Sequence, residues 1–237
     1  MSEFQQENRR RTRRYAIVFA CLFLVLLLIF YANVSVGTVA LRGDLVSQTI
    51  LWRIRLPRVC LAMILGGALA LSGFLLQTFF ENPIAGPYIL GISSGAKLTV
   101  TLSMLLTLTQ LRTTSAAINV VAAFIGALLS TGFILLISKR VQHMASILIG
   151  GIMIGYVASA ITDFLITFAE DADIVNLHGW SLGSFSGADW TDVRVSLAVV
   201  GVTMALIFAM SKQIGAFRLG EGYARSLGVD VRRFRTI

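Results

Sequence analysis

The sequence has little charge. Only 14% of its 237 residues are Asp, Glu, Lys or Arg, whereas 56% are hydrophobic. A soluble domain of this length could not cover its surface with so few polar groups. The chain has three prolines and two cysteines, and both Cys21 and Cys60 lie in apolar runs without the spacing of a disulfide framework or a metal site, so we interpret them as packing residues. The composition excludes a soluble domain and predicts an integral membrane protein.

The groups needed for catalysis are also scarce. No cluster of His, Cys, Asp or Glu has metal-ligand spacing, and no Gly-Lys-Ser/Thr loop is present to hold a phosphate. We therefore expect no catalytic residue, no metal and no cofactor bound by this chain, and no ATP hydrolysis by it. The net charge of +8 does not indicate nucleic acid as a partner, because Lys and Arg gather in the cytoplasmic loops of membrane proteins.

Long apolar stretches between the charges predict an all-α, polytopic helical bundle with six spans and the start of a seventh. Each stretch is near or above the roughly 20 residues that a helix needs to cross the hydrocarbon layer. Only Lys97 and Asp163 are charged within them. The predicted spans are 15–32, 59–80, 88–111, 113–138, 144–169 and 195–211, with 231–237 beginning the seventh.

The distribution of arginine predicts the orientation. Residues 1–14 contain a basic cluster directly before the first span, which places the N-terminus in the cytoplasm. Alternation then places the loops at 81–87 and 139–143 and the tail from 212 inside, and the acidic segment 170–192 outside. The cluster consists of Arg9, Arg10, Arg11, Arg13 and Arg14.

Three arginines depart from this rule at the outer end of the second span, namely Arg53, Arg55 and Arg58. Arg55 and Arg58 are three residues apart around Pro57, a residue suited to a helix start, so they could project to one side as a pair of cations. Two interpretations remain open, docking of an acidic partner from outside and anchoring to lipid phosphates.

Small residues recur at intervals of four, which lets helices approach closely in a membrane. These rows predict a tight bundle. They are Ala62, Gly66 and Ala70; Gly91 and Gly95; Ala122, Gly126 and Ser130; and Gly151, Gly155 and Ser159.

Asp163 continues the last row toward the outer end of the fifth span. A carboxylate there should face protein or water, because placing its charge against lipid would cost several kcal/mol. It could line a transport pathway or form a buried, hydrogen-bonded structural group, and Lys97 could instead extend to the cytoplasmic interface.

Three segments outside the spans have distinct patterns. Two prolines and a glycine in 81–87 require the backbone to leave the helix. The glycine-containing segment 170–190 reads as irregular chain, either a vestibule wall or a loop. Glu221 to Leu227 can form a short helix ended by Gly228, suited to act as a lever for a soluble partner or to form an ordinary interfacial turn.

Six motifs occur in one order, and together they resemble the FecCD-type permeases, the transmembrane subunits of ABC importers for iron-siderophore complexes, haem and vitamin B12. The resemblance covers nearly everything after about residue 50. The motifs are Arg55-Leu-Pro-Arg58, Gly66 to Gly73 followed by Gln77, Asn82-Pro-Ile-Ala, Leu90 to Ala96, Trp180 to Gly187 and Gly220 to Gly228.

The resemblance implies a multi-pass protein of the bacterial plasma (inner) membrane with several partners. These are a second permease subunit, identical or homologous, an ATP-binding subunit that uses the ATP, and an extracellular or periplasmic solute-binding protein, besides membrane lipid. It also implies residue roles. Arg55 and Arg58 would dock the binding protein. Within segment 213–230, the ATPase-coupling residues would be Gly220, Glu221, Gly222, Ala224, Arg225, Leu227 and Gly228. The pathway or gate residues would be Met144, Ala145, Ser146 and Asp163, and the structural motif residues Asn82, Pro83, Gly91, Gly95, Trp180 and Gly183.

The chain departs from the family pattern in two ways. Members usually have about ten spans, so we interpret this chain as a fragment of such a permease. Met144 and Ala145 stand where the family often has Ser or Thr, so the gate residues of this chain differ from the family pattern.

Within the family, an iron-siderophore complex is the expected ligand, with haem and vitamin B12 as alternatives. A different class of function is an ion-coupled secondary transporter that uses Asp163 or Lys97. A membrane scaffold that transports nothing is a third.

Overall fold

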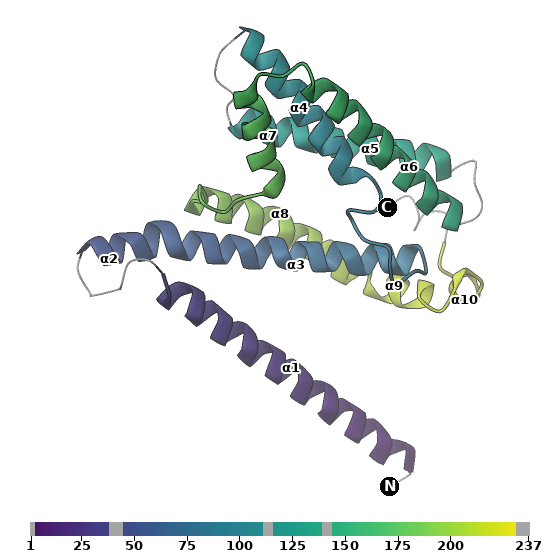
Figure 1. Cartoon of the computed structure of the whole chain (residues 1–237). Coiled ribbons are helices and arrows are strands. Elements are labelled where there is room, and N and C mark those ends of the chain that lie inside the picture. The colour runs from purple at the N-terminus through teal and green to yellow at the C-terminus, as the bar shows by residue number, and fades with distance from the viewer. Residues whose placement is uncertain (1–2, 38–44, 111–115, 139–143, 231–237) are drawn as a thin grey trace. The chain divides into compact units, whose positions relative to one another are not determined.

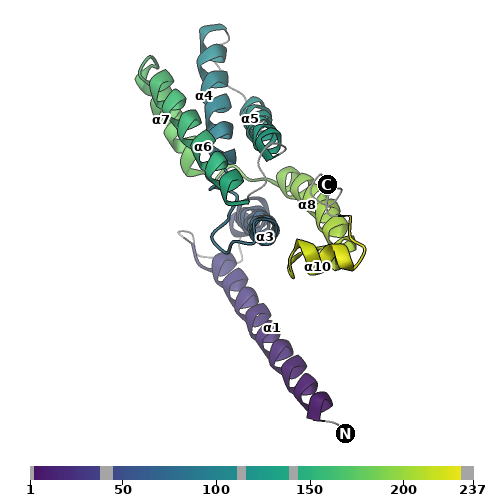
Figure 2. The same cartoon turned by 90° about the vertical axis from the view of Figure 1, so that its right-hand side faces the viewer.

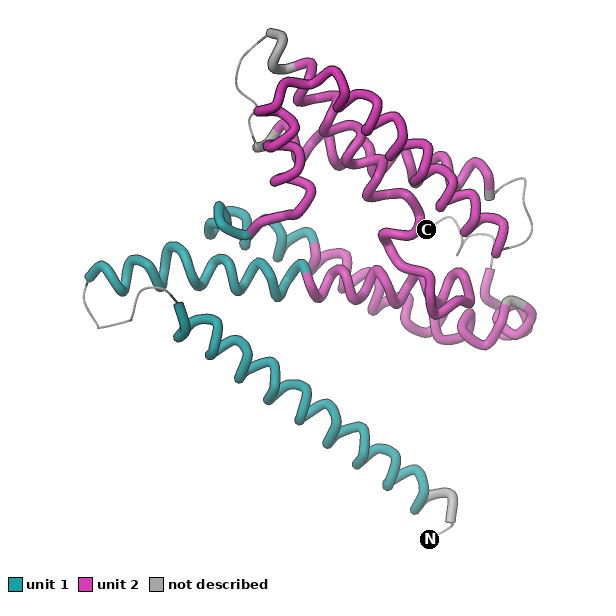
Figure 3. Tube along the Cα trace, in the orientation of Figure 1, with its two compact units in different colours: residues 1–65, 185–199 teal, residues 66–184, 200–237 magenta. Residues whose placement is uncertain are grey.

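The computed structural model describes residues 3–37, 45–110, 116–138 and 144–230, which form helices joined by turns (Figure 1). The chain divides into two compact units (Figure 3). Unit 1 comprises residues 1–65 and 185–199, and unit 2 comprises residues 66–184 and 200–237.

Unit 1 begins with a single long helix, α1 (Glu3–Ser35). Its apolar side chains are exposed on every side of the helix, from Tyr15 to Tyr31. A helix that is apolar all round and long enough to cross the bilayer is suited to lipid rather than water. The first predicted span therefore lies within α1, which is longer at both ends.

The second half of unit 1 is a helix with a local change of pitch. α2 (Leu45–Ile50) continues as the π-helical turn η1 (Leu51–Arg55) and then as α3 (Leu56–Phe79). The amide of Leu56 donates to the carbonyl of Leu51, five residues back. Pro57 cannot donate a backbone hydrogen bond, and a π turn is one way in which a helix absorbs such a disruption. The prediction that Pro57 stands at a helix start is wrong, because the helix already begins at Leu45.

Unit 2 contains the most closely packed helices. α4 (Ile92–Gln110) packs against both α5 (Ala116–Ser138) and α6 (Met144–Ile166), and the three lie side by side in two views (Figures 1 and 2). α7 (Asp171–Leu182) also contacts α4. α8 (Trp190–Ala209) begins in unit 1 and ends in unit 2, where α9 (Ser211–Phe217) and α10 (Glu221–Ser226) follow.

Glycine and serine make the contacts between α4 and its two neighbours. A Cβ on Gly91 would lie 2.6 Å from the amide nitrogen of Gly155 and 2.7 Å from the carbonyl oxygen of Gly151. A Cβ on Gly95 would overlap Ser130 and approach the carbonyl oxygen of Gly126. Three of the four predicted small-residue rows are therefore confirmed as sites of close helix packing. The row on α3 differs, since Gly66 and Ala70 are exposed.

Each of the six predicted spans overlaps a helix. Among the described residues, five helices are long and apolar enough to cross a membrane, and the described apolar part of α4, Ile92–Leu106, is shorter. The expectation of irregular chain throughout 170–190 is wrong for residues 171–182, which form α7. Its first turn contains Asp171 and Asp173, which favour a helix N-terminus. The predicted start of a seventh span, 231–237, lies outside the described residues.

Candidate functional site

Arg55 is partly buried and closes the end of α1. Its Nη1 donates to the carbonyl oxygens of Val34 at 2.8 Å and Ser35 at 3.2 Å. The last carbonyls of a helix have no partner within it and carry partial negative charge, so a guanidinium there is stabilising. A Cβ on Gly37 would overlap this guanidinium. Arg55 therefore fastens the end of α1 to η1.

Arg58, in the first turn of α3, contacts a different part of unit 1. Its Nη2 donates to the carbonyl oxygen of Ser186, in the segment before α8. Trp190, four residues after Ser186, donates a hydrogen bond from its indole Nε1 to the carbonyl oxygen of Trp52 at 2.7 Å. The structure thus directs Arg55 and Arg58 to separate partners rather than to one side as a pair. Arg53, on η1, is exposed.

The predicted short helix near the end of the chain is confirmed as α10. The amide of Gly228 donates to the carbonyl of Arg225, and that of Val229 to the carbonyl of Ala224, both at 3.0 Å. Gly228 has φ +81°, the left-handed conformation expected of a residue that ends a helix. Before the helix, Gly220 has φ +101° and ψ 151°, a region open essentially to glycine alone.

α10 has one buried and one exposed face. Ala224 is fully buried, and it packs with Ala216 and Phe217 of α9. The exposed coupling residues are Gly222, Arg225, Leu227 and Gly228, and Tyr223 is exposed beside Gly222. Glu221 is the first residue of the helix. A short helix held from one side in this way offers its other side to a partner.

The turn between α3 and α4 carries the Asn82-Pro83 motif. The side-chain Oδ1 of Asn82 accepts a hydrogen bond from the amide of Ile84 at 2.9 Å, and its carbonyl accepts one from Ala85 at 3.1 Å. Such a side-chain bond stabilises a turn. The turn ends at Gly91, which has a φ of +72° and directly precedes α4. This confirms that the backbone leaves the helix here.

The side chains predicted for the pathway lie along α6. Met144 is its first residue, Ala145 and Ser146 are exposed, and the next residue, Ile147, is buried. Asp163 is exposed on the same helix. One turn earlier, the hydroxyl of Ser159 lies 3.2 Å from the hydroxyl of Ser94.

Trp180 and Gly183 belong to the end of α7. Trp180 packs against a cluster of Val100, Met104 and Leu177. Gly183, at φ +75°, ends the helix, and its amide donates to the carbonyl of Trp180 at 3.1 Å. Both residues shape α7 and its contact with α4.

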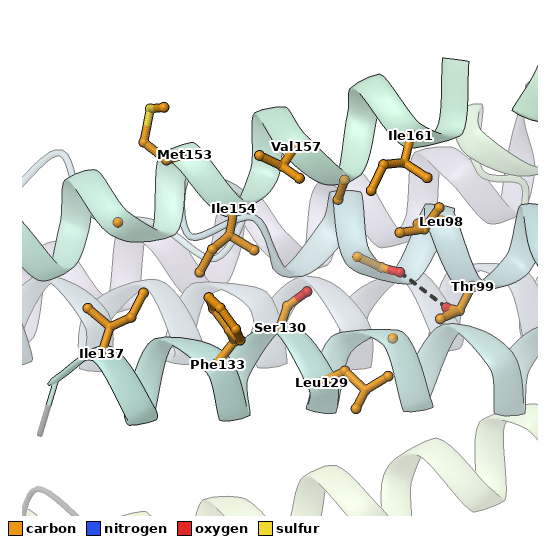
Figure 4. Close-up of a pocket in the computed structure, with 14 residues that line it drawn as sticks. Leu98, Thr99, Leu129, Ser130, Phe133, Ile137, Met153, Ile154, Val157 and Ile161 are labelled. Carbon is orange, nitrogen blue, oxygen red and sulfur yellow. Dashed lines mark hydrogen bonds between the residues drawn. The ribbon is translucent and has the colours of Figure 1, made fainter. Parts of the chain in front are cut away.

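A groove of about 550 Å³ lies along α4, α5 and α6 (Figure 4). Leu129, Phe133 and Ile154 are among the apolar side chains that line it, and the only polar side chains are the hydroxyls of Thr99 and Ser130. Thr99 donates to the carbonyl oxygen of Ala122 at 2.7 Å. A surface of this kind suits acyl chains or another helix rather than a charged ligand. Among the described residues, no group of three His, Cys, Asp or Glu could hold a metal ion.

Some contacts of the site residues could not be predicted from a pattern in the sequence. The partners of Arg55 and Arg58 are backbone carbonyls about 20 and 128 residues away in sequence. The burial of Phe217 depends on its contact with Ala224 of α10, although an aromatic residue between glycines is a weak indication of an anchor.

The chain is similar to known transport proteins over almost its whole length. A sequence model of the FecCD transport family matches residues 16–237. The vitamin B12 import system permease protein BtuC of Pectobacterium atrosepticum is 33% identical, over 98% of this chain and 69% of that protein. BtuC of Escherichia coli O127:H6 is 31% identical, over 100% of this chain and 72% of that protein.

A solved structure has the same fold. It is described as an inward-facing conformation of a metal-chelate type ABC transporter, and it matches with a TM-score of 0.82 and 24% identity. The match covers 93% of this chain and 70% of the other. At that identity the similarity concerns the fold alone.

Proposed function

This chain belongs to the FecCD transport family as a permease subunit of an ABC importer, and we propose that it translocates a metal chelate into the cytoplasm. ATP is hydrolysed by a separate subunit. The observation that carries the proposal is the family match over residues 16–237 together with the capped helix α10 at the position of the Gly220 to Gly228 motif.

The proposed cycle begins outside the membrane. A loaded solute-binding protein with acidic groups docks on the outer surface of unit 1, at the turn formed by η1 and the start of α3. Arg58 supplies a cation there, and Arg55 keeps the turn fastened to α1 through the Val34 and Ser35 carbonyls. Such charge complementarity contributes to the rate and specificity of docking.

Inside the cell, the exposed face of α10 lies against an ATP-binding subunit. Closure of two such subunits on ATP displaces α10, and the displacement opens the pathway past the start of α6, at Met144, Ala145 and Ser146. A second permease subunit, identical or homologous, completes the pathway, which Asp163 lines from α6.

The cargo is a chelate of the class that includes iron-siderophore complexes, haem and vitamin B12. The relatives described above import vitamin B12, so cobalamin is the first compound to test. An iron-siderophore complex, the expectation from the sequence, is the second. Selection of the cargo belongs mainly to the binding protein, because the described part of this chain has no concentrated group of charged or polar side chains that would recognise it.

The test is uptake by membrane vesicles that contain this chain and the products of its neighbouring genes. Radiolabelled cyanocobalamin and a ferric hydroxamate siderophore are offered separately, with ATP or a non-hydrolysable analogue inside. We expect uptake of one of them only with ATP and the binding protein.

The same vesicles test the alternative of ion-coupled transport. Uptake that needs no ATP and stops when a proton or sodium gradient is collapsed would replace the ABC importer by a secondary transporter. Asp163→Asn and Lys97→Gln would then be the variants expected to abolish it.

A further inference from the structure

Phe217 is the anchor of the coupling segment. It is fully buried, and it packs with Ala216 and with Ala224 of α10, against which Val229 also lies. α8 ends at Ala209 and α9 begins at Ser211, and Met210 between them has φ −90° and ψ 5°, which departs from regular helix geometry. The buried side chains hold α9 and α10 together.

The same phenylalanine reaches the end of α3. The rings of Phe217 and Phe79 are stacked, with centroids 6.3 Å apart and planes 12° apart. Next to this pair, the guanidinium of Arg218 lies 5.6 Å from the ring centroid of Phe74. An offset ring stack and a cation over an aromatic face are both attractive arrangements. α9 is therefore attached to α3 at two adjacent points.

From Phe79 the packing continues to the start of α6. Phe79 lies edge-on to Phe80, with centroids 5.2 Å apart. Phe80 belongs to a buried cluster that also contains Ala85, Leu90 and Ile147, and Phe79 packs against the same cluster. Ile147 directly follows Ser146, one of the residues proposed for the gate. All these residues belong to unit 2.

We infer that the Phe217–Phe79 stack is the mechanical link through which movement of α10 reaches the gate at the start of α6. A close-packed interior has low compressibility, so a displacement of a fully buried side chain moves its neighbours rather than being absorbed. The chain of contacts from Ala224 through Phe217, Phe79 and Phe80 to Ile147 is unbroken. Phe217 and Phe79 are positioning residues, since neither touches the cargo, and the inference rests on the proposed function.

The experiment compares the variants Phe217→Ala and Phe79→Ala in the assembled transporter, with cyanocobalamin and the ferric siderophore as probes. The matched control is Phe208→Ala, which removes a ring that is 80% exposed on α8. Three quantities are measured: retention of the ATP-binding subunit, ATP hydrolysis with and without the binding protein, and cargo imported per ATP. Phe217→Leu and Phe79→Leu keep apolar volume without the ring stack and serve where an alanine variant does not accumulate.

We expect both stack variants to retain the ATP-binding subunit and hydrolyse ATP while importing about tenfold less cargo per ATP. The double variant should be no worse than either single one, because both remove the same link. Phe208→Ala should behave as the unchanged protein.

Three results would contradict the inference or its premise. Unchanged import per ATP in both stack variants would overturn the link. Loss of the ATP-binding subunit would overturn it too, because Phe217 would then serve attachment rather than transmission. An unchanged protein that retains no ATP-binding subunit would instead remove the proposed function itself.

Discussion

Arg55 and Arg58 are three residues apart in one motif, yet they hold different parts of unit 1 in place. Arg55 binds the end of α1, and Arg58 binds the Ser186 carbonyl. The sequence indicated the importance of both, because cations at the outer end of a span are unusual. It could not indicate their partners, which are backbone groups that only the fold brings near.

Because Arg55 and Arg58 have different partners, reversing the charge of each should have a different consequence. Arg55→Glu should lower stability by about 2 kcal/mol or more, because it places a carboxylate against helix carbonyls and removes charge-assisted hydrogen bonds. Arg58→Glu should reduce uptake through weaker docking, with a smaller effect on stability. Thermal unfolding in detergent measures the first effect, and uptake over a range of binding-protein concentrations measures the second.

Two outcomes would contradict these predictions. If Arg55→Glu unfolds at the same temperature as the unchanged protein, Arg55 does not cap α1. If Arg58→Glu transports normally at every concentration of binding protein, the docking assignment is wrong.

Gly95 lies where α4 crosses α5. The spacing of small residues in the sequence predicted this contact. Gly95→Ala should destabilise the protein by about 2 kcal/mol, a typical cost of overpacking, since its Cβ would meet Ser130 and Gly126. Gly132→Ala on α5 is the control, because nothing lies within 4 Å of its Cβ. Equal thermal unfolding of the two variants would show that the crossing tolerates a methyl group.

At the scale of elements, α10 was predictable because its signals are local. Gly228 marks its end, and the helix is found at Glu221–Ser226. α7 was missed because Gly179 and several polar residues weaken its helical pattern, although its acidic first turn was a signal. The π turn before Pro57 was also missed, since the adjustment to a proline is settled by the packing of the whole helix.

The glycine before α10 leads to a prediction about this element. Gly220→Ala should strain the backbone by roughly 1–3 kcal/mol, because φ +101° with ψ 151° excludes a side chain. The cost should loosen α10 and lower uptake. Gly215→Ala, inside α9 and not among the coupling residues, has nothing within 4 Å of its Cβ, and it should be neutral or slightly stabilising.

The two variants are compared by limited proteolysis of the segment after α9 and by uptake. Faster cleavage and slower uptake for Gly220→Ala alone are expected. Equal behaviour of the two variants would mean that the geometry at Gly220 does not position α10.

At the scale of the whole molecule, the sequence predicted an all-helical membrane protein because apolar length between charges is a direct consequence of the bilayer. The long-range contacts, such as the Phe217–Phe79 stack, depend on tertiary packing and were not predictable. The cytoplasmic N-terminus remains a prediction from the arginines of residues 9–14.

Reporter fusions test this orientation. Alkaline phosphatase joined after residue 187 should be active, because it would lie outside, whereas green fluorescent protein joined after residue 142 should fluoresce inside. The reverse pattern would contradict the assignment of sides and with it both docking surfaces.

The central claim is that this permease works with a separate ATP-binding subunit through α10. The most direct measurement is purification of the tagged chain in mild detergent, with and without residues 220–228, from cells that also express its neighbouring genes, followed by mass spectrometry. The intact chain should retain an ATP-binding subunit, and the shortened chain, present in the membrane at a similar level, should lose it. Absence of such a subunit from the intact chain, or its equal retention by both, would show that α10 does not hold one.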